Sequence, residues 1–371
     1  MKLLNKIIPL VLVLALAFSL CACGSEPAPA ESAAPTETGG VSRVIVDANG
    51  REVEIPQTVE SIVCIGVGAL RYTCYMQGQE LVVGVEDYEN EPSLSRLYNY
   101  VNSALFKSLP PIGGNGEPWE EEIIKADPQV IVMSTYAKCD ADELQSKTGV
   151  PVVVVGGSDT TLDDKAYETL RILGELYGKE DRAEELTAYL HGIETDLAAR
   201  TGNVPDTDKP TAYVCGVSFK GNHGFEGTEA NYGPFVLINA NNLADQTGQE
   251  LAFDVDPEQV LSWDPDVIFI DFNGMELIKE DYATNAGLYN SLTAVKEGRV
   301  YSQISFRSYA SNLDTALADA YYAASVLYPT EFADMDIEAK IGEIFETLLG
   351  ANPYNDLKDA GYEFRALTIG E

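Results

Sequence analysis

The sequence predicts an α/β protein of two Rossmann-like lobes with parallel sheets, joined by a single long rigid α-helix and separated by a ligand cleft. The first observation is an internal repeat: residues 121–132 and 258–269 align without a gap as helix, Asp-Pro break and β-branched run. Proline ends the helix because it lacks an N–H group, and the following run suits a strand buried on both faces. In addition, strands and helices alternate in both halves, and a long helical stretch separates the halves.

The first residues predict export from the cytoplasm. Residues 1–22 carry Lys2 and Lys6 before an apolar run, which is typical of a secretory signal. The small residues before Cys23 resemble the bacterial lipoprotein box, which implies removal of residues 1–22 and a lipid on Cys23. An ordinary signal peptide is the alternative. Residues 23–42, rich in Pro, Ala, Glu and Thr, predict a flexible tether.

The N-terminal lobe is predicted over residues 43–160. A buried strand enters a turn with Gly66, Gly68 and Arg71, and Glu86 follows about 20 residues on, which partly matches a dinucleotide-binding fingerprint. Arg71 stands where that fingerprint needs its third glycine, so a dinucleotide-dependent enzyme is the less favoured interpretation. The same geometry suits capture of an anion by N–H groups at the helix start and by the guanidinium of Arg71.

Residues 161–201 form the predicted connecting helix. Apolar residues recur at helical spacing on both sides of Gly178, so one face is expected to be buried. From Asp181 to Arg200 the helix would span about 30 Å at ~1.5 Å per residue. Such a strut can join two lobes stiffly.

The C-terminal lobe is predicted over residues 202–371. After its first strand comes a loop dense in polar and aromatic residues, which includes Lys220, His223 and Tyr232. Loops carry binding sites disproportionately, so His223 is favoured for the cleft, whereas His191 on the strut is expected to face solvent.

Cations at the ends of strands suggest the chemistry of the ligand. Arg71, Lys220 and Arg307 all follow predicted strands in a chain poor in cations, and ligands of open parallel sheets lie beyond those strand ends. We therefore expect an anionic ligand, or one with carbonyl and phenolate oxygens, with chance placement as the alternative. The candidate ligand-binding residues are Gly68, Arg71, Tyr136, Lys220, His223, Tyr232, Arg307 and Tyr309.

Composition argues against several functions. The chain has 59 acidic and 24 basic residues and a formal net charge of −35, so no nucleic acid partner is expected. With two histidines, and without a metal-ligand spacing, a nucleophile elbow or a P-loop, we expect no metal site, no cofactor and no catalysed reaction. Buried free thiols are favoured, and a disulfide stays open, for Cys64, Cys74, Cys139 and Cys215.

Several motifs, taken in order, resemble the substrate-binding lipoproteins of ABC importers for iron complexes, siderophores and cobalamin, which are class III periplasmic binding proteins. The likeness covers nearly the whole mature chain. It is carried by the opening hairpin at 47–53, the turn Gly68–Arg71, the segments 83–86 and 112–114, the paired helix-Asp-Pro-strand motif, and residues 295–301.

This resemblance implies a non-enzymatic, extracytoplasmic monomer, anchored to the cell membrane by a lipid on Cys23, that captures an iron complex and delivers it to the transmembrane subunits of a permease. One glutamate per lobe would meet arginines of that permease, and by the repeat these are Glu121 and Glu258. A simple helix-start charge is the alternative for both. Cobalamin, haem, molybdate and tungstate are alternative ligands. A cleft enzyme and an adhesin or sensory lipoprotein are the alternatives from other classes.

Overall fold

The computed structural model describes residues 41–157 and 161–370, which belong to one compact unit spanning residues 40–371. The signal sequence, Cys23 and most of the predicted tether lie outside the described residues. None of the helices described within these two ranges combines the length and the apolar character that crossing a bilayer requires.

The N-terminal lobe is built on a parallel sheet in the order β4-β3-β7-β8. Its strands are β3 (Ile62–Ile65), β4 (Val82–Gly84), β7 (Val130–Ser134) and β8 (Val152–Val155). Around it lie β1 (Ser42–Val46), β2 (Glu52–Pro56), β5 (Gly113–Gly114), β6 (Glu117–Pro118), α1 (Ala69–Tyr75), α2 (Leu97–Val101), α3 (Ser103–Phe106), α4 (Glu120–Ala126) and α5 (Ala141–Thr148). Every residue of β3, β7 and β8 is buried, as expected for a parallel sheet with both faces covered.

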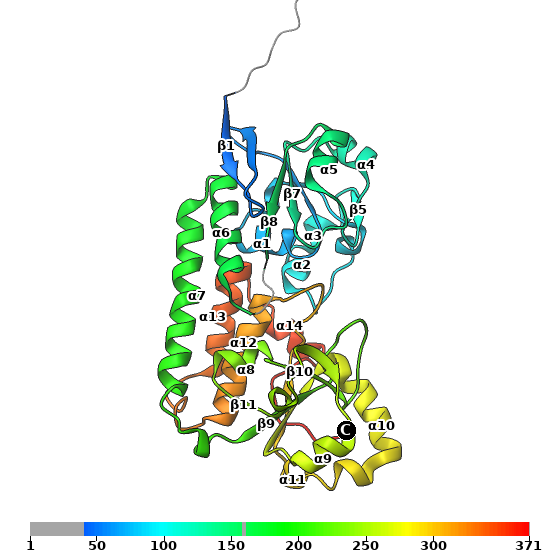
Figure 1. Ribbon diagram of the computed structural model, residues 1–371, viewed down its shortest axis with the longest axis vertical. Helices are drawn as coiled ribbons and strands as arrows, with labels where there is room; N and C mark the ends of the chain where they lie inside the picture. Colours follow the sequence, from blue (N-terminus) through cyan, green and yellow to red (C-terminus); the bar gives the residue numbers. More distant parts are fainter. Residues whose placement is uncertain (1–40, 158–160, 371) are drawn as a thin grey trace, which may run out of the picture. The chain divides into compact units, whose positions relative to one another are not determined.

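The C-terminal lobe repeats the same strand order, β11-β9-β13-β14. Its parallel strands are β9 (Thr211–Cys215), β11 (Asn241–Asn242), β13 (Val267–Asp271) and β14 (Val300–Gln303). It adds the antiparallel pair β10 (Gly227–Ala230) and β12 (Leu251–Asp254), with α8 (Gly233–Leu237), α9 (Pro257–Trp263), α10 (Met275–Tyr289), α11 (Thr293–Lys296), α12 (Leu313–Leu327), α13 (Ile337–Leu349) and α14 (Tyr354–Asp359). The predicted α/β class with two parallel sheets is confirmed (Figure 1).

The internal repeat has a shared local geometry. Helix α4 ends at Asp127 and α9 ends at Asp264, and both aspartates adopt the left-handed conformation, with φ of 51° and 44°. The chain then passes through proline, which cannot continue a helix, into β7 or β13. Aspartate tolerates positive φ better than most residues, so the Asp-Pro pair stops both helices in the same way.

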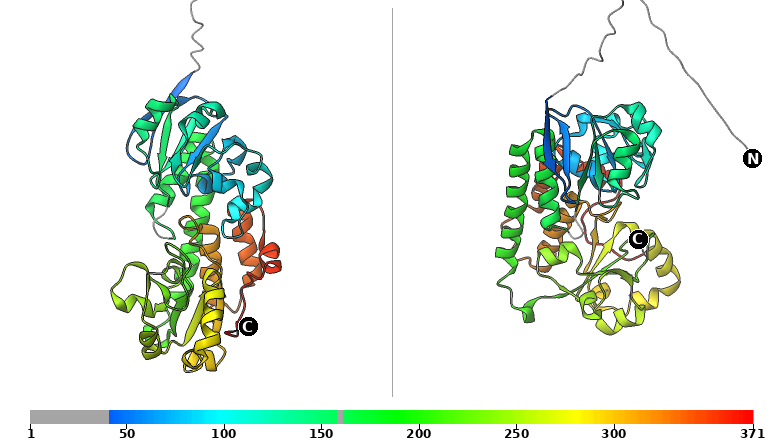
Figure 2. Two further views of the ribbon diagram at one scale, coloured as in Figure 1. Left: turned by 90° about the vertical axis from the view of Figure 1, so that its right-hand side faces the viewer. Right: turned by 45° about the horizontal axis from the view of Figure 1, so that its top comes forward.

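The connection between the lobes differs in detail from the predicted strut. Two antiparallel helices, α6 (Asp164–Tyr177) and α7 (Glu180–Thr201), meet at Gly178, whose φ of 63° ends the first helix. An added Cβ on Gly174 would lie 2.7 Å from the Cβ of Ala183, so the helices are in close contact near the turn. Of these two helices, α7 runs alongside both lobes, whereas α6 packs on the N-terminal sheet (Figure 1 and Figure 2).

The core is continuous between the lobes. One cluster of buried residues includes side chains from both sheets and from α7, α12 and α13. Helix α13, which the sequence assigned to the C-terminal lobe, packs against α1 and α2 of the N-terminal lobe. Arg182 on α7 reinforces this contact, because it donates to the carbonyl of Tyr75 at 3.1 Å and also to that of Thr347.

Candidate functional site at the facing sheet edges

The carboxyl-terminal edges of the two sheets meet through Arg71. Arg71 follows β3, and its guanidinium donates to three carbonyls of the loop after β14: Ser308 at 3.0 Å, Tyr309 at 2.6 Å and Ser311 at 2.9 Å. These contacts place the loops after β3 and β14 against each other. Open parallel sheets bind ligands at this edge, so the geometry brings several candidate residues to the same region.

Arg71 itself is buried between the lobes. Its side chain is 1% exposed, and its guanidinium lies 5.2 Å from the centre of the Tyr98 ring. Because Nη1 and Nη2 are occupied by carbonyls, the fork expected to capture an anion here connects the two lobes instead. In this structure Arg71 is a contact between lobes, and its role toward a ligand stays a prediction.

An aromatic stack extends the same contact. The rings of Tyr88, which follows β4, and Tyr309 are parallel within 5°, with centroids 4.3 Å apart. The guanidinium of Arg96 lies 5.2 Å from the centre of the Tyr88 ring and 5.0 Å from that of Tyr309. Tyr309 remains 39% exposed, so part of its side chain is available to another molecule.

Glu86 connects two backbone turns at this edge of the sheet. Its carboxylate accepts from the backbone N–H groups of Gly66 at 2.9 Å and Gly116 at 2.5 Å. Burial raises the pKa of Glu86, and these two N–H donors act in the opposite direction. The acid that the dinucleotide interpretation assigned to a ribose is thus bonded to the protein backbone on both oxygens.

The C-terminal cations differ in their availability. Arg307 forms an ion pair with Glu229 on β10 and donates to the hydroxyl of Ser311 at 3.0 Å. Glu229 is buried, and burial raises its pKa, with Arg307 acting against the rise. Lys220 is exposed, and its side chain has no hydrogen bond or ion pair within the described residues 41–157 and 161–370.

The remaining candidates divide between surface and core. Tyr136 follows β7 and is 40% exposed, and Gly68 begins α1 with open space next to its Cα. Tyr232 lies in the core, where its ring packs edge-on against Phe235 and Phe306. The structure therefore brings Arg71, Tyr309 and Arg307 together where the loops after β3 and β14 meet, a region called the seam below. The ring of Tyr232 does not face solvent.

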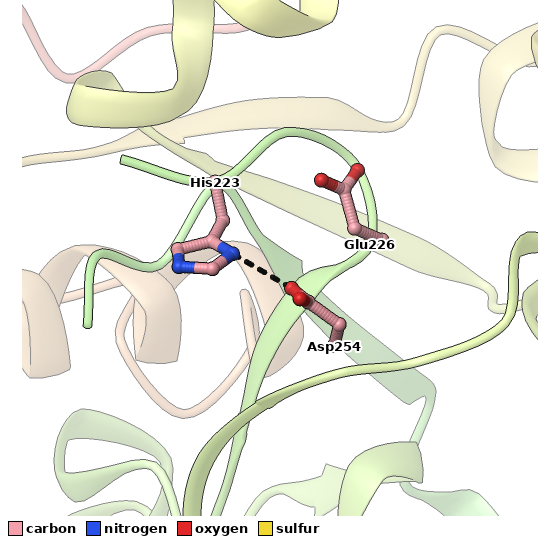
Figure 3. Close-up of side chains that lie close together, drawn as sticks. All are labelled: His223, Glu226 and Asp254. Atoms are coloured by element: carbon pink, nitrogen blue, oxygen red, sulfur yellow. Dashed lines mark hydrogen bonds and ion pairs between the residues drawn. The ribbon is translucent and has the colours of Figure 1, made fainter. Parts of the chain in front are cut away.

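His223 lies in a cluster that the sequence did not reveal (Figure 3). Its Nδ1 is 2.8 Å from Oδ1 of Asp254 at the end of β12, and its Nε2 is 2.9 Å from the carbonyl of Phe219. The carboxylate of Glu226 completes the group, since one ligand atom from each of His223, Glu226 and Asp254 lies within 4.8 Å of the others. Asp254 is 31 residues from His223 and reaches it only because β10 pairs with β12, so spacing alone gave no signal.

The two predicted docking glutamates occupy equivalent places in the repeat. Glu121 lies in the first turn of α4 and Glu258 in the first turn of α9, and both are exposed. Their carboxylates have no ion pair among the described residues, whereas neighbouring Glu120 and Glu122 bind Lys147 and Lys125. The placement is compatible with either a partner or a favourable helix-start charge.

The cysteines of the described residues are free thiols. Cys64, Cys74 and Cys215 are buried, and Cys139 is partly exposed. Burial raises the pKa of Cys64 to about 12, so this thiol is unreactive at neutral pH. The favoured interpretation of the three buried thiols as small hydrophobic residues is confirmed.

Comparison with known proteins identifies the family. Residues 73–303, more than half of the chain, match the family described as "Periplasmic binding protein". The chain belongs to this family. Periplasmic binding proteins are solute-binding components and not enzymes, so the predicted class and the absence of catalysis are supported by this membership.

Relatives of this periplasmic binding protein are distant in sequence. The "Fe(3+)-citrate-binding protein YfmC" of Bacillus subtilis (strain 168) is 24% identical over 222 residues, which cover 59% of this chain and 65% of that protein. A periplasmic solute binding protein from Veillonella parvula superposes with a TM-score of 0.67 at 18% identity, over 84% of this chain and 94% of that one. The molybdate-bound MolA of Haemophilus influenzae superposes with a TM-score of 0.64 at 19% identity, over 84% and 98%. These structures share the fold.

Proposed function

We propose that this periplasmic binding protein is the solute-capturing subunit of an ABC importer and that its cargo is an iron complex of the ferric siderophore type. The observation that carries the proposal is the meeting of the two sheet edges through Arg71 and the loop after β14. Two lobes that meet at their strand ends make the kind of site in which open α/β sheets bind ligands. The family match and the name of the Bacillus relative favour iron in a chelate as the cargo.

Side chains that follow strands of the two sheets suit such a cargo. A ferric chelate presents oxygen donors and an organic shell, and both kinds of surface need a partner. Lys220 offers a cation that no described residue neutralises, and Tyr309 and Tyr136 offer partly exposed aromatic faces. Cations attract the oxygens, while aromatic rings bury the apolar shell and fix its orientation.

A ligand screen by thermal shift tests this proposal. The panel contains ferric citrate, ferric catecholate and hydroxamate siderophores, haem, cobalamin, molybdate and tungstate, with each iron-free chelator as the matched control. We expect a ferric chelate to raise the melting temperature, because a ligand that binds the native state and is present at 100 times its Kd stabilises that state by ~2.7 kcal/mol. Stabilisation by cobalamin, haem or an oxyanion alone would assign the protein to another cargo.

We also propose that Glu121 and Glu258 dock on the permease. Both are exposed and form no ion pair with any described residue, and the repeat places one on each lobe, so a permease with arginines on two facing surfaces can bind both. Charge reversal of the pair, with Glu184→Arg on the exposed face of α7 as control, should reduce cargo uptake in cells about tenfold, since ~1.4 kcal/mol of lost docking energy is a tenfold change. Unchanged uptake, or an equal loss in the control, contradicts the docking role.

The predicted location of the protein is a separate proposal. We propose that the chain works outside the cytoplasm and is held at the membrane by a lipid on Cys23. Labelling of cells with a radioactive fatty acid should mark the wild-type chain and fail to mark Cys23→Ser. Equal labelling of both chains, or recovery of the unlabelled wild-type protein from the medium, would show that the sequence is an ordinary signal.

A further inference from the structure

A neutral His223 ring cannot donate hydrogen bonds to both of its polar neighbours. Nε2 faces the carbonyl of Phe219 at 2.9 Å, and Nδ1 faces a carboxylate oxygen of Asp254 at 2.8 Å. Both neighbours are acceptors, and a neutral imidazole carries one N–H donor. If Nε2–H donates to the carbonyl, the lone pair of Nδ1 points at a negative oxygen. If Nδ1–H donates to Asp254 instead, the lone pair of Nε2 faces the carbonyl oxygen. Each neutral tautomer thus satisfies one of the two contacts, and a metal ion at Nδ1 or a second ring proton would satisfy both.

The surroundings of His223 match those of a metal-binding histidine. Histidines that bind a metal through one nitrogen commonly donate the other N–H to a backbone carbonyl, which fixes the tautomer and the ring orientation. The carbonyl of Phe219, 2.9 Å from Nε2, stands where it can accept this N–H. The ring of Phe219 also stacks on that of His223, with centroids 3.7 Å apart and an interplanar angle of 8°.

The loop that carries His223 is held in place before any ion arrives. A Cβ added to Gly227 would lie 2.3 Å from the Cβ of His223, and one added to Gly274 would lie 2.5 Å from the carbonyl oxygen of His223. The loop therefore packs tightly on β10 and on the segment after β13. Glu226 is oriented in turn, because its carboxylate accepts from the N–H of Gly224 at 3.2 Å.

We propose that His223, Glu226 and Asp254 form a binding site for a divalent transition-metal ion of the zinc class, with Nδ1 of His223 as the nitrogen ligand and one carboxylate oxygen from each acid. The ligand atoms already lie within 4.8 Å of one another. Ligands at ~2.1 Å around a tetrahedral ion are separated by roughly 3.4 Å, so small side-chain rotations suffice to close the site. The carboxylate of Asp254 is 53% exposed, which leaves a side open to water and to the incoming ion.

The ligand set favours some ions over others. One imidazole nitrogen and two carboxylate oxygens suit Zn²⁺ and its neighbours Co²⁺ and Ni²⁺, whereas Mg²⁺ and Ca²⁺ prefer oxygen ligands alone. The ion is bound here directly by protein side chains, whereas the cargo proposed above carries its own chelator. Occupancy of the site would tie the loop after β9 to the end of β12.

Competition with a chromophoric zinc chelator tests the site on the purified, metal-stripped full chain. The two histidines of the chain provide a matched pair of variants: His223→Gln removes a proposed ligand, and His191→Gln removes a histidine that faces one carboxylate, Glu194, at 2.9 Å. We expect one tight Zn²⁺ per wild-type chain, an affinity at least tenfold lower in His223→Gln and Asp254→Asn, and an affinity within about twofold of wild type in His191→Gln.

Two further readouts separate a metal site from a hydrogen-bonded cluster. Zn²⁺ should raise the melting temperature of the wild type and of His191→Gln but not of His223→Gln, whose circular dichroism spectrum checks that it is folded. Mg²⁺ at the same concentration should leave all three unchanged. The proposal is overturned if the wild type binds no Zn²⁺, if His223→Gln binds it as tightly, or if several weak sites respond equally in every variant, as a chain of net charge −35 would show by diffuse attraction.

Discussion

The first turns of the two sheets are copies of each other, whereas the segments that follow them are not. Gly66 after β3 and Gly216 after β9 have φ of 83° and 77°. A Cβ added to Gly66 would lie 2.6 Å from Oγ of Ser134, the last residue of β7, and one added to Gly216 would lie 2.9 Å from the carbonyl oxygen of Asp271, the last residue of β13. Each turn thus presses against the end of the next strand in its sheet.

After the turn the lobes diverge. In the N-terminal lobe α1 starts at Ala69 and buries Arg71, which reaches the other lobe. In the C-terminal lobe the chain runs through an irregular loop to β10 at Gly227, and this loop carries Lys220 and His223. The duplicated part of each lobe positions the strands, and the part that differs supplies the side chains from which a ligand or an ion can be bound.

The largest loss of stability is expected when a Cβ is added to the glycine that begins the turn after β3 or β9. Gly216→Ala should lower the free energy of unfolding by about 3 kcal/mol or more, because the atoms it meets are backbone atoms of Asp271 and Gly274, and positive φ adds ~1–2 kcal/mol. Gly66→Ala should cost about 2 kcal/mol, since its nearest contact is the Ser134 side chain. Urea unfolding measures both.

Gly68→Ala is the control for the turn prediction. Its φ is 94°, and no atom lies within 4 Å of an added Cβ, so the conformational cost of ~1–2 kcal/mol acts without a steric one. If Gly216→Ala is no less stable than Gly68→Ala, the backbone around Gly216 can move to accept a Cβ without loss of stability. The close contact between each turn and the adjacent strand would then not stabilise the sheets.

The next largest effect distinguishes Arg71, which connects the two lobes, from Arg307, which makes its contacts within the C-terminal lobe. Arg71→Met removes a donor from three loop carbonyls, of which only that of Ser308 keeps another from a described residue, the Asn312 amide, and should cost about 2 kcal/mol, with an increase in the radius of gyration by small-angle scattering. Arg307→Met also destabilises, because it strands the buried carboxylate of Glu229, but it should leave the radius unchanged.

A second substitution distinguishes the two arginines. Replacing Glu229 by Gln in the Arg307→Met background removes the buried unpaired charge and should restore part of the stability. The partners of Arg71 are backbone carbonyls, so no side-chain replacement can compensate for its loss. Equal radii in the two arginine variants would contradict the assignment of Arg71 to the seam between lobes.

Features that depend on local sequence patterns could be predicted from the sequence alone. The repeated Asp-Pro break at Asp127 and Asp264 predicted both helix ends and the buried strands that follow. The apolar stripe of α7 was also readable, since Leu186, Leu190 and Leu197 recur at helical spacing and are buried. These features depend on backbone chemistry and periodicity, which do not need the rest of the fold.

Features that depend on distant segments were missed. The burial of Arg71 depends on a loop about 240 residues away, and that of Tyr232 depends on Phe306. The return of α13 to the N-terminal lobe and the partner of His223 likewise follow from packing and strand pairing that no spacing records. A residue that follows a strand is placed at the right edge of the sheet, but only the packed structure decides whether it faces a ligand or the core.

The smallest effect concerns the strand ends Ser134 and Asp271, which are equivalent in the repeat but differ in charge. Burial raises the pKa of Asp271 from its ordinary 3.8 to about 7, although the Ser305 hydroxyl and the Asn273 N–H favour its ionised form. The folded state therefore keeps a proton that the unfolded state releases. Stability from this group is present below about pH 4 and is lost as the pH rises toward 7.

Asp271→Asn tests this difference between the lobes. The amide cannot ionise, so the free energy of unfolding of the variant relative to wild type should rise between pH 6 and pH 7 by about 1 kcal/mol. Ser134→Asn at the equivalent strand end should show no such trend, because serine carries no titrating charge. Unfolding curves at both pH values measure the trend. Equal changes in the two variants would mean that the charge of Asp271 does not cause it.

The same substitution should also change the titration of Asp319, whose pKa is raised by burial and by the charge of Asp271. In Asp271→Asn the pKa of Asp319 should lie closer to its ordinary range, which nuclear magnetic resonance of the carboxyl carbon can follow.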